Sequence, residues 1–410
     1  MSELSPNARL AASRFATQFV PRWYDHMRDP LGGGVFERMD AAGRAVKGDT
    51  KTSLVQARTV FTLAHLYNET GNSRLLDAAR DVHAFLDDRL RDADGGYRFA
   101  DGGAQSDAMR RTYDQSFALL ALVTLRRADP AAVPQSRIDR TWAFIANVLT
   151  DASDNSLWED DEMAREGAGI GALRGQNPHM HMLEALLQAF AMTREAVWLE
   201  RARPLLEVAR ERFVDPSTGA VREFVGPDLA PLDNAACRRR EPGHQYEWAW
   251  LIHRHAALSG ESQWLPLAAP MVDFAERHGL RDEGPLAGAP YDAVDADGHA
   301  VETTHLLWPL TEAGKLYAAL FAKEQKPDHA AKASRAATLV FDRFFPAANE
   351  TGLSWVNQLS GTGDVVWAEG LTRLLYHVAL LVTEGARAGL WPVEPVGLDR
   401  PTSTKQERKP

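Results

Sequence analysis

Histidine, glutamate and arginine side chains recur inside helical segments that are otherwise almost wholly apolar. A buried polar group costs free energy unless it is hydrogen-bonded or used in function, so these positions are the first candidates for chemistry. Histidine is the natural proton carrier near neutral pH, and a neighbouring carboxylate or arginine can orient it or bind developing negative charge. The positions are Arg58, Tyr113, Asp114, Asn177, His179, His181, Glu184, His244, Glu247, His305, Trp308, Glu312, Tyr376 and His377.

These polar positions also recur in register along the chain. Steps of 67, 66, 65 and 65 residues lead from Asp114 to His181, Glu247, Glu312 and His377. Taken singly, a histidine in an apolar helix is more often a hydrogen-bonded core residue, and Arg58 could simply pair with Asp114. In a closed ring of repeats, however, equivalent positions converge on one central cavity. The register therefore predicts a shared site.

The pattern does not resemble a metal site. No HExxH motif occurs, and two histidines two residues apart on a helix, such as His179 and His181, point about 200° apart. A metal held by residues of different helices stays open as an alternative. No glycine-rich phosphate loop and no GxSxG elbow are present in the sequence.

Six short turn segments punctuate the chain at intervals of about 60 to 67 residues. Each combines Asp, Pro or Gly turn residues with a few residues of strand type. They are DPLGGGVFE from Asp29, DADGGYRFA from Asp92, DASDNSLWED from Asp151, DPSTGAVREF from Asp215, DEGPLAGAPYD from Asp282 and FPAANETGLSWVN from Phe345.

Pairs of segments with helical periodicity flank these turns, one before and one after each. The first of each pair, before the turn, is amphipathic, as in 74–90 and 198–213, which predicts a half-exposed outer helix. The sequence therefore predicts an all-α fold, an (α/α)6 barrel of six helical hairpins with short β-type turns at one end. An open solenoid of the same hairpins is the alternative, but capping repeats with polar outer faces are not evident. The second segment of each pair is apolar almost all round and should be buried: 53–67, 115–128, 182–195, 246–258, 306–320 and 371–382.

The bulk composition excludes several classes of function. No linker divides the chain, so residues 1–397 form one predicted catalytic domain, followed by a polar C-terminal tail over 398–410. A net charge of −10 without a long basic run argues against nucleic acid as a partner. No apolar run approaches the roughly 20 residues of a membrane helix, so no membrane partner is expected. The single Cys237 and the lack of a signal-peptide pattern favour a cytoplasmic protein. A homodimer is left open.

The segments VQAR, NPHMHMLEA, EPGHQYEWAW, LWPLTEA and LYH, in this order, resemble the N-acylglucosamine 2-epimerase superfamily. That group includes cellobiose 2-epimerases, mannose isomerases and some bacterial mannose-6-phosphate isomerases. The resemblance runs from about Arg58 to His377. It implies an (α/α)6 barrel that isomerises or epimerises a small-molecule monosaccharide, with histidines as acid and base and without a metal or cofactor.

The resemblance also implies roles for individual residues. His244 and His377 are the acid/base pair that moves the proton at C2 of an aldose through a cis-enediolate, and Glu247 orients His244. Arg58 stabilises negative charge on O1 and O2, and His181 holds hydroxyls or assists ring opening. A histidine base predicts that turnover falls below about pH 6. The further candidates for substrate binding are Tyr113, Asp114, Asn177, Glu184, His305, Trp308 and Glu312.

Two positions depart from the family pattern. Leu310 stands where glutamine is common, and Trp367 is followed by Ala368, whereas some members carry a histidine there. The short forms of EPGHQYEWAW and LWPLTEA favour isomerisation of D-mannose to D-fructose. If a proton returned to C2 from the opposite face, the enzyme would be a 2-epimerase of the mannose/glucose or N-acylglucosamine type. One site can serve either outcome.

Three further readings stay open. A phosphorylated sugar, as in a mannose-6-phosphate isomerase, could use Lys47, Lys51 or the run Arg238 to Arg240 as phosphate ligands. A glycoside hydrolase would need a pair of carboxylates across the scissile bond, such as Asp114 with Glu247 or Glu312. A non-catalytic binding protein is the remaining class, although no exposed apolar stripe supports it.

Overall fold

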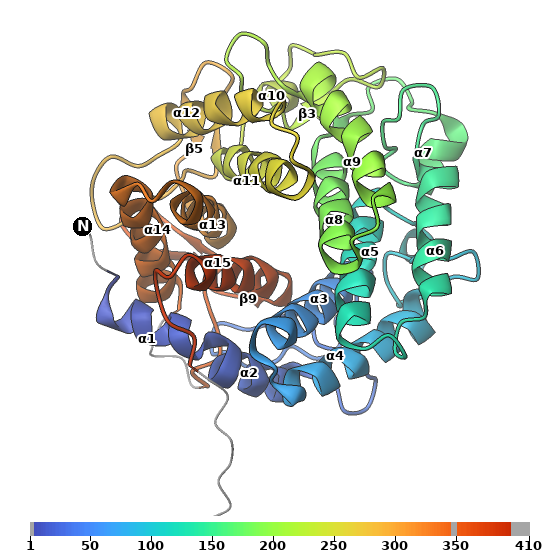
Figure 1. Cartoon of the computed structure of the whole chain (residues 1–410), viewed down its shortest axis with the longest axis horizontal. Helices are drawn as coiled ribbons and strands as arrows, with labels where there is room; N and C mark the ends of the chain where they lie inside the picture. The colour runs from blue at the N-terminus through green and yellow to red at the C-terminus, as the bar shows by residue number, and fades with distance from the viewer. Residues whose placement is uncertain (1–3, 346–350, 395–410) are drawn as a thin grey trace, which may run out of the picture.

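A computed structural model of the chain describes residues 4–345 and 351–394. In it the helices form two concentric rings (Figure 1). The inner ring consists of α3 (Ser53–Thr70), α5 (Thr112–Ala128), α8 (Asn177–Thr193), α11 (Pro242–Ser259), α13 (Leu307–Glu324) and α15 (Leu375–Arg387). The outer ring consists of α1 (Pro6–Arg14) with α2 (Val20–Met27), α4 (Ser73–Phe85), α6 (Gln135–Phe144), α9 (Val197–Val208), α12 (Ala268–His278) and α14 (Pro327–Leu339).

Shorter helical pieces extend or connect these elements. Two short α-helices lie in loops, α7 (Asp161–Glu166) and α10 (Ala235–Arg238). π-Helical turns join α1 to α2 and end four outer helices: η1 (Phe15–Phe19), η2 (Leu86–Leu90), η4 (Ile145–Leu149), η5 (Ala209–Phe213) and η7 (Val340–Phe344). The 3-10 turns are η3 (Gln105–Ala108), η6 (Leu265–Leu267) and η8 (Thr372–Leu374).

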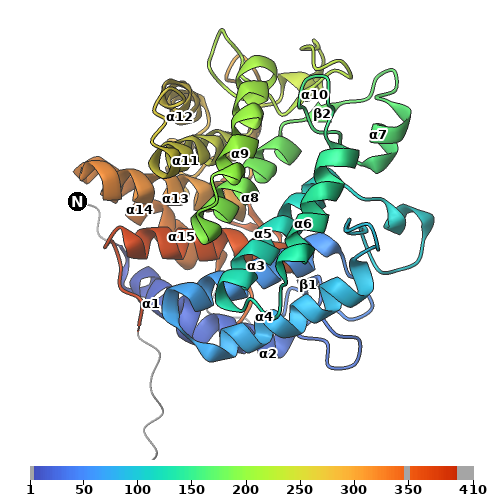
Figure 2. The ribbon, with the colours of Figure 1, turned by 45° about the vertical axis from the view of Figure 1, so that its right-hand side comes forward.

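The ring of hairpins is closed. Each inner helix packs against the next along the chain, and α15 packs against α3. The strand β1 (Arg38–Met39) pairs antiparallel with β9 (Gly370–Leu371) and so joins the first turn to the last. At this junction α1 contacts α14, and η1 contacts both α15 and α3. Figure 2 shows α1 beside these C-terminal helices. The predicted (α/α)6 barrel is confirmed, and the open solenoid is wrong.

The inner helices are buried because the outer ring and both inner neighbours cover them. In α3 the buried residues run without a break from Ser53 to Leu66. The Thr52 hydroxyl caps its first turn by accepting from the Val55 amide, and Gly71 ends it with a φ of 71°. Polar residues near the start of such a helix therefore face either a hydrogen-bond partner or the ring axis.

The short strands gather with the turns at one end of the barrel, as expected. Besides β1 and β9, they form two antiparallel pairs and one three-stranded sheet in the order β6-β7-β8. The pairs are β2 (Arg174–Gly175) with β3 (Phe224–Val225) and β4 (Ala293–Val294) with β5 (Ala300–Glu302). The sheet comprises β6 (His305–Leu306), β7 (Gln358–Leu359) and β8 (Val365–Trp367).

A repeated side-chain bond ties each of four turns to the following inner helix. Gln56 accepts from the Val35 amide and donates to its carbonyl, both at 2.9 Å. Gln115 and Gln245 bond Tyr97 and Val221 in the same way. In the third repeat His179 takes this place, because its Nε2 accepts from the Leu157 amide at 2.9 Å. His179 is therefore a structural residue of the repeat.

Some expectations fall outside the described residues. The turn that begins at Phe345 includes residues 346–350, and the tail 398–410 lies wholly outside. The division into a domain over 1–397 and a tail stays a prediction. Within the described ranges, no helix is long and apolar enough to cross a membrane.

Candidate active site

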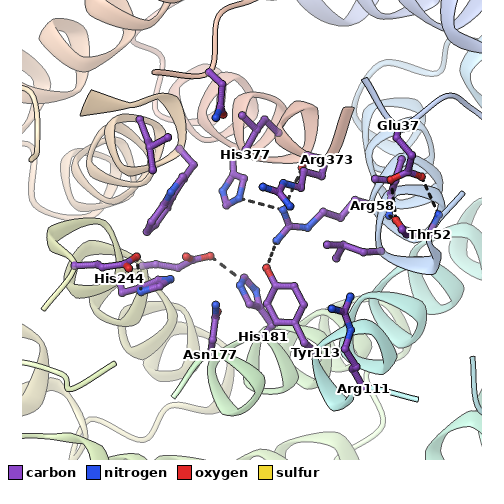
Figure 3. A pocket seen from close by; sticks show the side chains of 18 of the residues that line it. Glu37, Thr52, Arg58, Arg111, Tyr113, Asn177, His181, His244, Arg373 and His377 are labelled. Atoms are coloured by element: carbon purple, nitrogen blue, oxygen red, sulfur yellow. Dashed lines mark hydrogen bonds and ion pairs between the residues drawn. The ribbon is translucent and has the colours of Figure 1, made fainter. Parts of the chain in front are cut away.

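A cavity of about 500 Å³ opens on the ring axis at the turn-bearing end of the barrel. Its wall is built from the first turns of the inner helices and from the loops that precede them (Figure 3). The lining residues are Glu37, Thr52, Leu54, Val55, Arg58, Phe99, Arg111, Tyr113, Asn177, His181, Glu241, His244, Glu247, Leu306, Trp308, Asn357, Trp367, Arg373, Leu374 and His377.

Eight of the twelve predicted site residues line this cavity: Arg58, Tyr113, Asn177, His181, His244, Glu247, Trp308 and His377. The other four do not. Glu184 and Glu312 are fully buried and bind cavity histidines. Asp114 is held by Arg111 through both carboxylate oxygens, at 2.8 and 2.9 Å. His305 donates from Nδ1 to the Pro290 carbonyl and accepts from Arg281.

His377 is arranged as a neutral base. Its Nδ1 donates to Glu312 Oε1 at 2.8 Å, so its Nε2 keeps a lone pair on the cavity side, 3.5 Å from Arg58 Nη1. Desolvation lowers the pKa of His377 well below its ordinary value of 6.5, and the charges of Arg58 and Lys315 lower it further. The ring is therefore unprotonated at neutral pH, and the acid limb predicted from an unperturbed histidine moves to lower pH.

His244 is arranged in the opposite way, as an acid. Its Nδ1 lies 2.7 Å from Glu223 Oε2 and 3.4 Å from Glu241 Oε2. Desolvation lowers the pKa of His244, but the charges of Glu223 and Glu241 outweigh it and raise the pKa to about 9. The imidazolium form therefore prevails at neutral pH. The hydrogen-bond partner of Nδ1 is thus Glu223, not Glu247 as the sequence predicted.

Sequence reasoning missed Glu223 because it lies in a turn and not in an inner helix. The sequence signal for Glu223 was a carboxylate that recurs in the turns. In the structure each such carboxylate accepts a hydrogen bond from a backbone amide at the start of the next inner segment. Glu37 binds the Thr52 amide, Glu159 the Gly175 amide, Glu223 the Glu241 amide and Asp292 the Leu306 amide. Among these four carboxylates, Glu223 is the one that also binds a cavity histidine.

The third histidine of the cavity, His181, has a weaker case as a base. Its Nδ1 lies 3.0 Å from Glu184 Oε2, and Glu184 also accepts from the Tyr376 hydroxyl. Burial lowers the pKa of His181 to about 4. Beside it, the side-chain oxygen of Asn177 is buried without a hydrogen-bond partner among the described residues, so it is free to accept from a sugar hydroxyl.

Glu247 lies between the histidines as a buried carboxylic acid. It is 1% exposed, and neither of its side-chain oxygens has a hydrogen-bond partner among the described residues. One oxygen lies 4.0 Å from His181 Nδ1 and 4.0 Å from Lys315 Nζ. Burial and then the charge of Glu312 raise the pKa of Glu247 to about 8, which keeps it protonated at neutral pH.

Lys315 lies behind the cavity lining, beside the Glu312 carboxylate that holds His377, and it was not predicted from the sequence. It is fully buried, pairs with Glu312 and lies 4.0 Å above the ring of Trp250. A lysine one helical turn after a glutamate usually lies on a solvent-exposed helix face. The residues around Lys315 in this helix are mostly apolar, and this was the sequence signal that Lys315 is buried.

Arg58 presents a cation without a carboxylate partner in the described part of the chain. It donates to the Tyr113 hydroxyl at 2.7 Å and to the Arg373 carbonyl at 3.1 Å. Its Nη1 lies 3.5 Å from His377 Nε2, and its guanidinium stacks 4.1 Å above Phe117. The alternative pairing with Asp114 is wrong, because Arg111 occupies that carboxylate.

The basic residues considered as phosphate ligands do not line the cavity. Lys51 pairs with Asp29 at 2.6 Å. The arginine run is paired throughout: Arg238 with Asp297, Arg239 with Glu241 and Glu302, and Arg240 with Asp215. These cations hold the loops of the turn-bearing end together.

Three groups of side chains at the cavity have the spacing of metal ligands: His181 with Glu184 and Glu247, His244 with Glu223 and Glu241, and His377 with Glu247 and Glu312. In each group the nitrogen near the carboxylates is Nδ1, already in hydrogen-bond contact with one of them. A metal would therefore displace the bond that orients the ring. The metal-free expectation stays a prediction.

Comparison with known proteins identifies relatives of this chain by sequence. The family model for N-acylglucosamine 2-epimerase matches residues 34–380. The chain is 29% identical over 378 residues to a mannose-6-phosphate isomerase of Rhizobium meliloti, covering 89% of this chain and 93% of that protein. It is 30% identical over 277 residues to a D-mannose isomerase of Thermobifida fusca, covering 62% and 64%.

Solved structures agree on the fold. A crystal structure of D-mannose isomerase superposes with a TM-score of 0.80 at 19% identity, covering 94% of this chain and 99% of that one. Cellobiose 2-epimerase from Bacillus thermoamylovorans B4167 gives 0.77 at 17% identity, covering 90% and 98%. An α-1,6-mannanase from Salegentibacter gives 0.61 at 12% identity, covering 92% and 99%. At such identities the likeness concerns the fold alone.

Proposed function

The chain belongs to the N-acylglucosamine 2-epimerase family and is a sugar isomerase or epimerase, and we propose that it interconverts D-mannose and D-fructose by moving the C2 proton through a cis-enediolate. One observation carries this proposal. Two histidines face the same cavity, each held at Nδ1 by a different buried carboxylate, and their pKa values are shifted in opposite directions, that of His377 down and that of His244 up to about 9. Pairs of titratable groups pushed apart in this way supply the base and the acid of a proton transfer.

The proton steps follow from this asymmetry. The unprotonated Nε2 of His377 takes the C2 proton of the open-chain aldose, and Arg58, 3.5 Å from that nitrogen, stabilises the negative charge of the enediolate. The His244 imidazolium protonates O1 and then removes the proton from O2. His377 returns its proton to C1, so that the C2 proton has moved to C1 and the O2 proton to O1.

The cavity suits one monosaccharide. Its volume lies in the range of about 300–1,000 Å³ typical of small-molecule sites. The Trp308 ring lies 4.7 Å from the His244 ring and 6.0 Å from the His377 ring, so it forms an apolar wall between the two.

A 2-epimerase outcome needs only that His244 donates to the opposite face of C2. A cytoplasmic location and a homodimer stay predictions.

The hydrolase reading has weaker support. It needs two carboxylates in the cavity, about 5–9.5 Å apart across the scissile bond. Asp114 is bound by Arg111 outside the cavity, and Glu312 is bound by Lys315 and His377 beneath it. Of the three carboxylates considered for that reaction, Glu247 is the one that lines the cavity. The other two lining glutamates are engaged, Glu37 by the Thr52 amide and hydroxyl and Glu241 by Arg239.

Isotope transfer from deuterated water tests the proposal. Wild-type protein is incubated with D-mannose in D2O, and the products are separated and analysed by NMR. The proposal expects fructose as the main product, and any deuterium that reaches it through exchange of the His377 proton with solvent lies at C1. Glucose deuterated at C2 as the main product would replace the isomerase by the epimerase. Neither fructose nor glucose as a product would overturn both.

A further inference from the structure

The two oxygens of one buried carboxylate bind different partners behind the cavity. Glu312 Oε1 accepts from His377 Nδ1 at 2.8 Å, and Glu312 Oε2 forms an ion pair with Lys315 Nζ. Lys315 is 0% exposed and is not among the residues that line the cavity. It therefore does not reach the sugar, and its effect on the reaction must pass through Glu312.

Stability alone does not explain a lysine in this place. Taking two charges out of water is costly, and replacing a buried ion pair by apolar side chains is often neutral or stabilising. Lys315 lies 4.0 Å from the Trp250 ring, in a helix that is mostly apolar around it, so an apolar side chain would suit its surroundings. A use in the reaction would account for the buried charge.

Lys315 is charged at neutral pH. Burial lowers its pKa, but the charges of Glu312, Glu247 and Glu184 outweigh burial and raise the pKa above the ordinary value of 10.5. Glu312 depends on this cation, because burial raises the pKa of Glu312 and the charge of Lys315 is the largest influence that lowers it. An ionised Glu312 only accepts hydrogen bonds, whereas a protonated one would also donate.

The state of Glu312 decides which nitrogen of His377 carries the ring proton. Beside an anionic Glu312 the proton stays on Nδ1, and Nε2 keeps its lone pair. Beside a protonated Glu312, Nδ1 would accept and the ring proton would lie on Nε2, where it blocks the base. If Glu312 kept its charge without Lys315, it would favour the imidazolium form of His377, which also lacks the lone pair.

We propose that Lys315 is a positioning residue, whose charge keeps Glu312 an anion and so fixes the tautomer of His377 that presents the Nε2 lone pair to the sugar. The proposal rests on the proposed isomerase function and deepens it. Arg58 supports the same state from the cavity side, because its guanidinium lies 3.5 Å from Nε2 and disfavours a proton there. The other titratable or charged groups that act on this ring or line the cavity with it include His181 and Glu184 on α8, Glu247 on α11, Arg373 on η8 and Tyr376 on α15.

Nitrogen NMR tests the proposal without any substrate. The protein is labelled with 15N-histidine, and the His377 signals are assigned by their absence in His377→Asn. At neutral pH the wild type should show an unprotonated Nε2 and a protonated Nδ1. Lys315→Met should show a protonated Nε2, whereas Lys315→Arg, which keeps the charge, should resemble the wild type. A wild type with its proton on Nε2, or a Lys315→Met protein with the wild-type pattern, would overturn the proposal.

A double variant covers the case in which Lys315→Met does not fold. Lys315→Met combined with Glu312→Gln removes both buried charges, so no unpaired ion is left. The new amide can donate as well as accept, so it no longer dictates the tautomer. The proposal predicts that Nε2 loses its purely unprotonated signal and that kcat for mannose falls by about tenfold or more. KM should change little, because neither residue lines the cavity. An unchanged kcat in the folded double variant would refute the role of Lys315.

Lys332→Met is the matched control. Lys332 forms ion pairs with Glu276 and Asp328 and does not line the cavity, so this variant should change neither the histidine spectrum nor kcat. The spectra also separate this proposal from the proposed function. If no sugar is turned over but the spectra differ as predicted, the isomerase assignment fails and the control of the His377 tautomer by Lys315 stands. If fructose forms and the Lys315 variants match the wild type in spectrum and kcat, the isomerase stands and this proposal fails.

Discussion

Replacing Glu223 by glutamine should make proton donation by His244 depend on pH between about pH 6 and pH 8, where the wild type changes little. The change keeps the size of the side chain but removes the charge 2.7 Å from His244 Nδ1. That charge is the largest of those that raise the pKa of His244 to about 9, and burial alone lowers it. Without Glu223 the pKa of His244 therefore falls toward 6.5. His244 acts as the acid only when it is protonated, so the variant should fail at alkaline pH first.

The magnitude follows from the protonated fraction. At pH 8 a group with a pKa of 9 is about 90% protonated and one with a pKa of 6.5 about 3%, which predicts a loss in kcat of about 30-fold. At pH 6 the two fractions differ by less than about twofold. Because the Glu241 carboxylate still lies 3.4 Å from His244 Nδ1 and favours the protonated ring, 30-fold is the upper limit of the expected loss in kcat. The ratio between the two pH values is the quantity to measure.

The assay follows ketose formation from saturating mannose between pH 5.5 and 9.5 for the wild type and the variant. Glu241→Gln is the graded control, since its charge is the smaller contribution, and it should move the alkaline limb less. A thermal melt checks the fold, because Glu223 also accepts from Gln176 and from the Glu241 amide. An equal loss at pH 6 and pH 8 would refute the reasoning and leave Glu223 a structural role alone.

Four further outcomes are expected. His377→Asn should lower kcat by about 10²–10⁴-fold while circular dichroism shows an intact fold, because a general base is lost; near-normal turnover would make His181 the better candidate. In the wild type the rate should stay level from pH 7 to below pH 6, since the pKa of His377 lies well below 6.5, and a drop centred on pH 6.5 in a pH–rate profile would contradict this. Lys315→Met leaves Glu312 buried without its cation and should destabilise the fold by about 3–5 kcal/mol in urea unfolding, with an unchanged midpoint as the contrary result. Turnover should survive exhaustive dialysis against EDTA, and a loss restored by one divalent cation would assign a metal to the site.

The spacing of the sequence was sufficient to predict the barrel. Turns at regular intervals and alternating apolar and amphipathic helices admit few arrangements, because each hairpin must bury one face on its neighbours. Ring closure needed more information. It depends on β1 pairing with β9 and on α15 packing against α3, contacts between the two ends of the chain.

The residues that face the sugar were largely predictable, whereas their partners were not. Eight positions on the inner helices line the cavity, because helical periodicity and repeat length together fix which side chains point to the axis. Helical periodicity does not single out Glu223, Lys315 or Arg373. Whether a histidine is acid or base depends on charges within a few ångströms, supplied by other turns and helices. The helical hairpins and the three cavity histidines could therefore be predicted from the sequence. The opposite pKa shifts of His244 and His377 could not, since they depend on distances to charged groups that exist only in the folded ring.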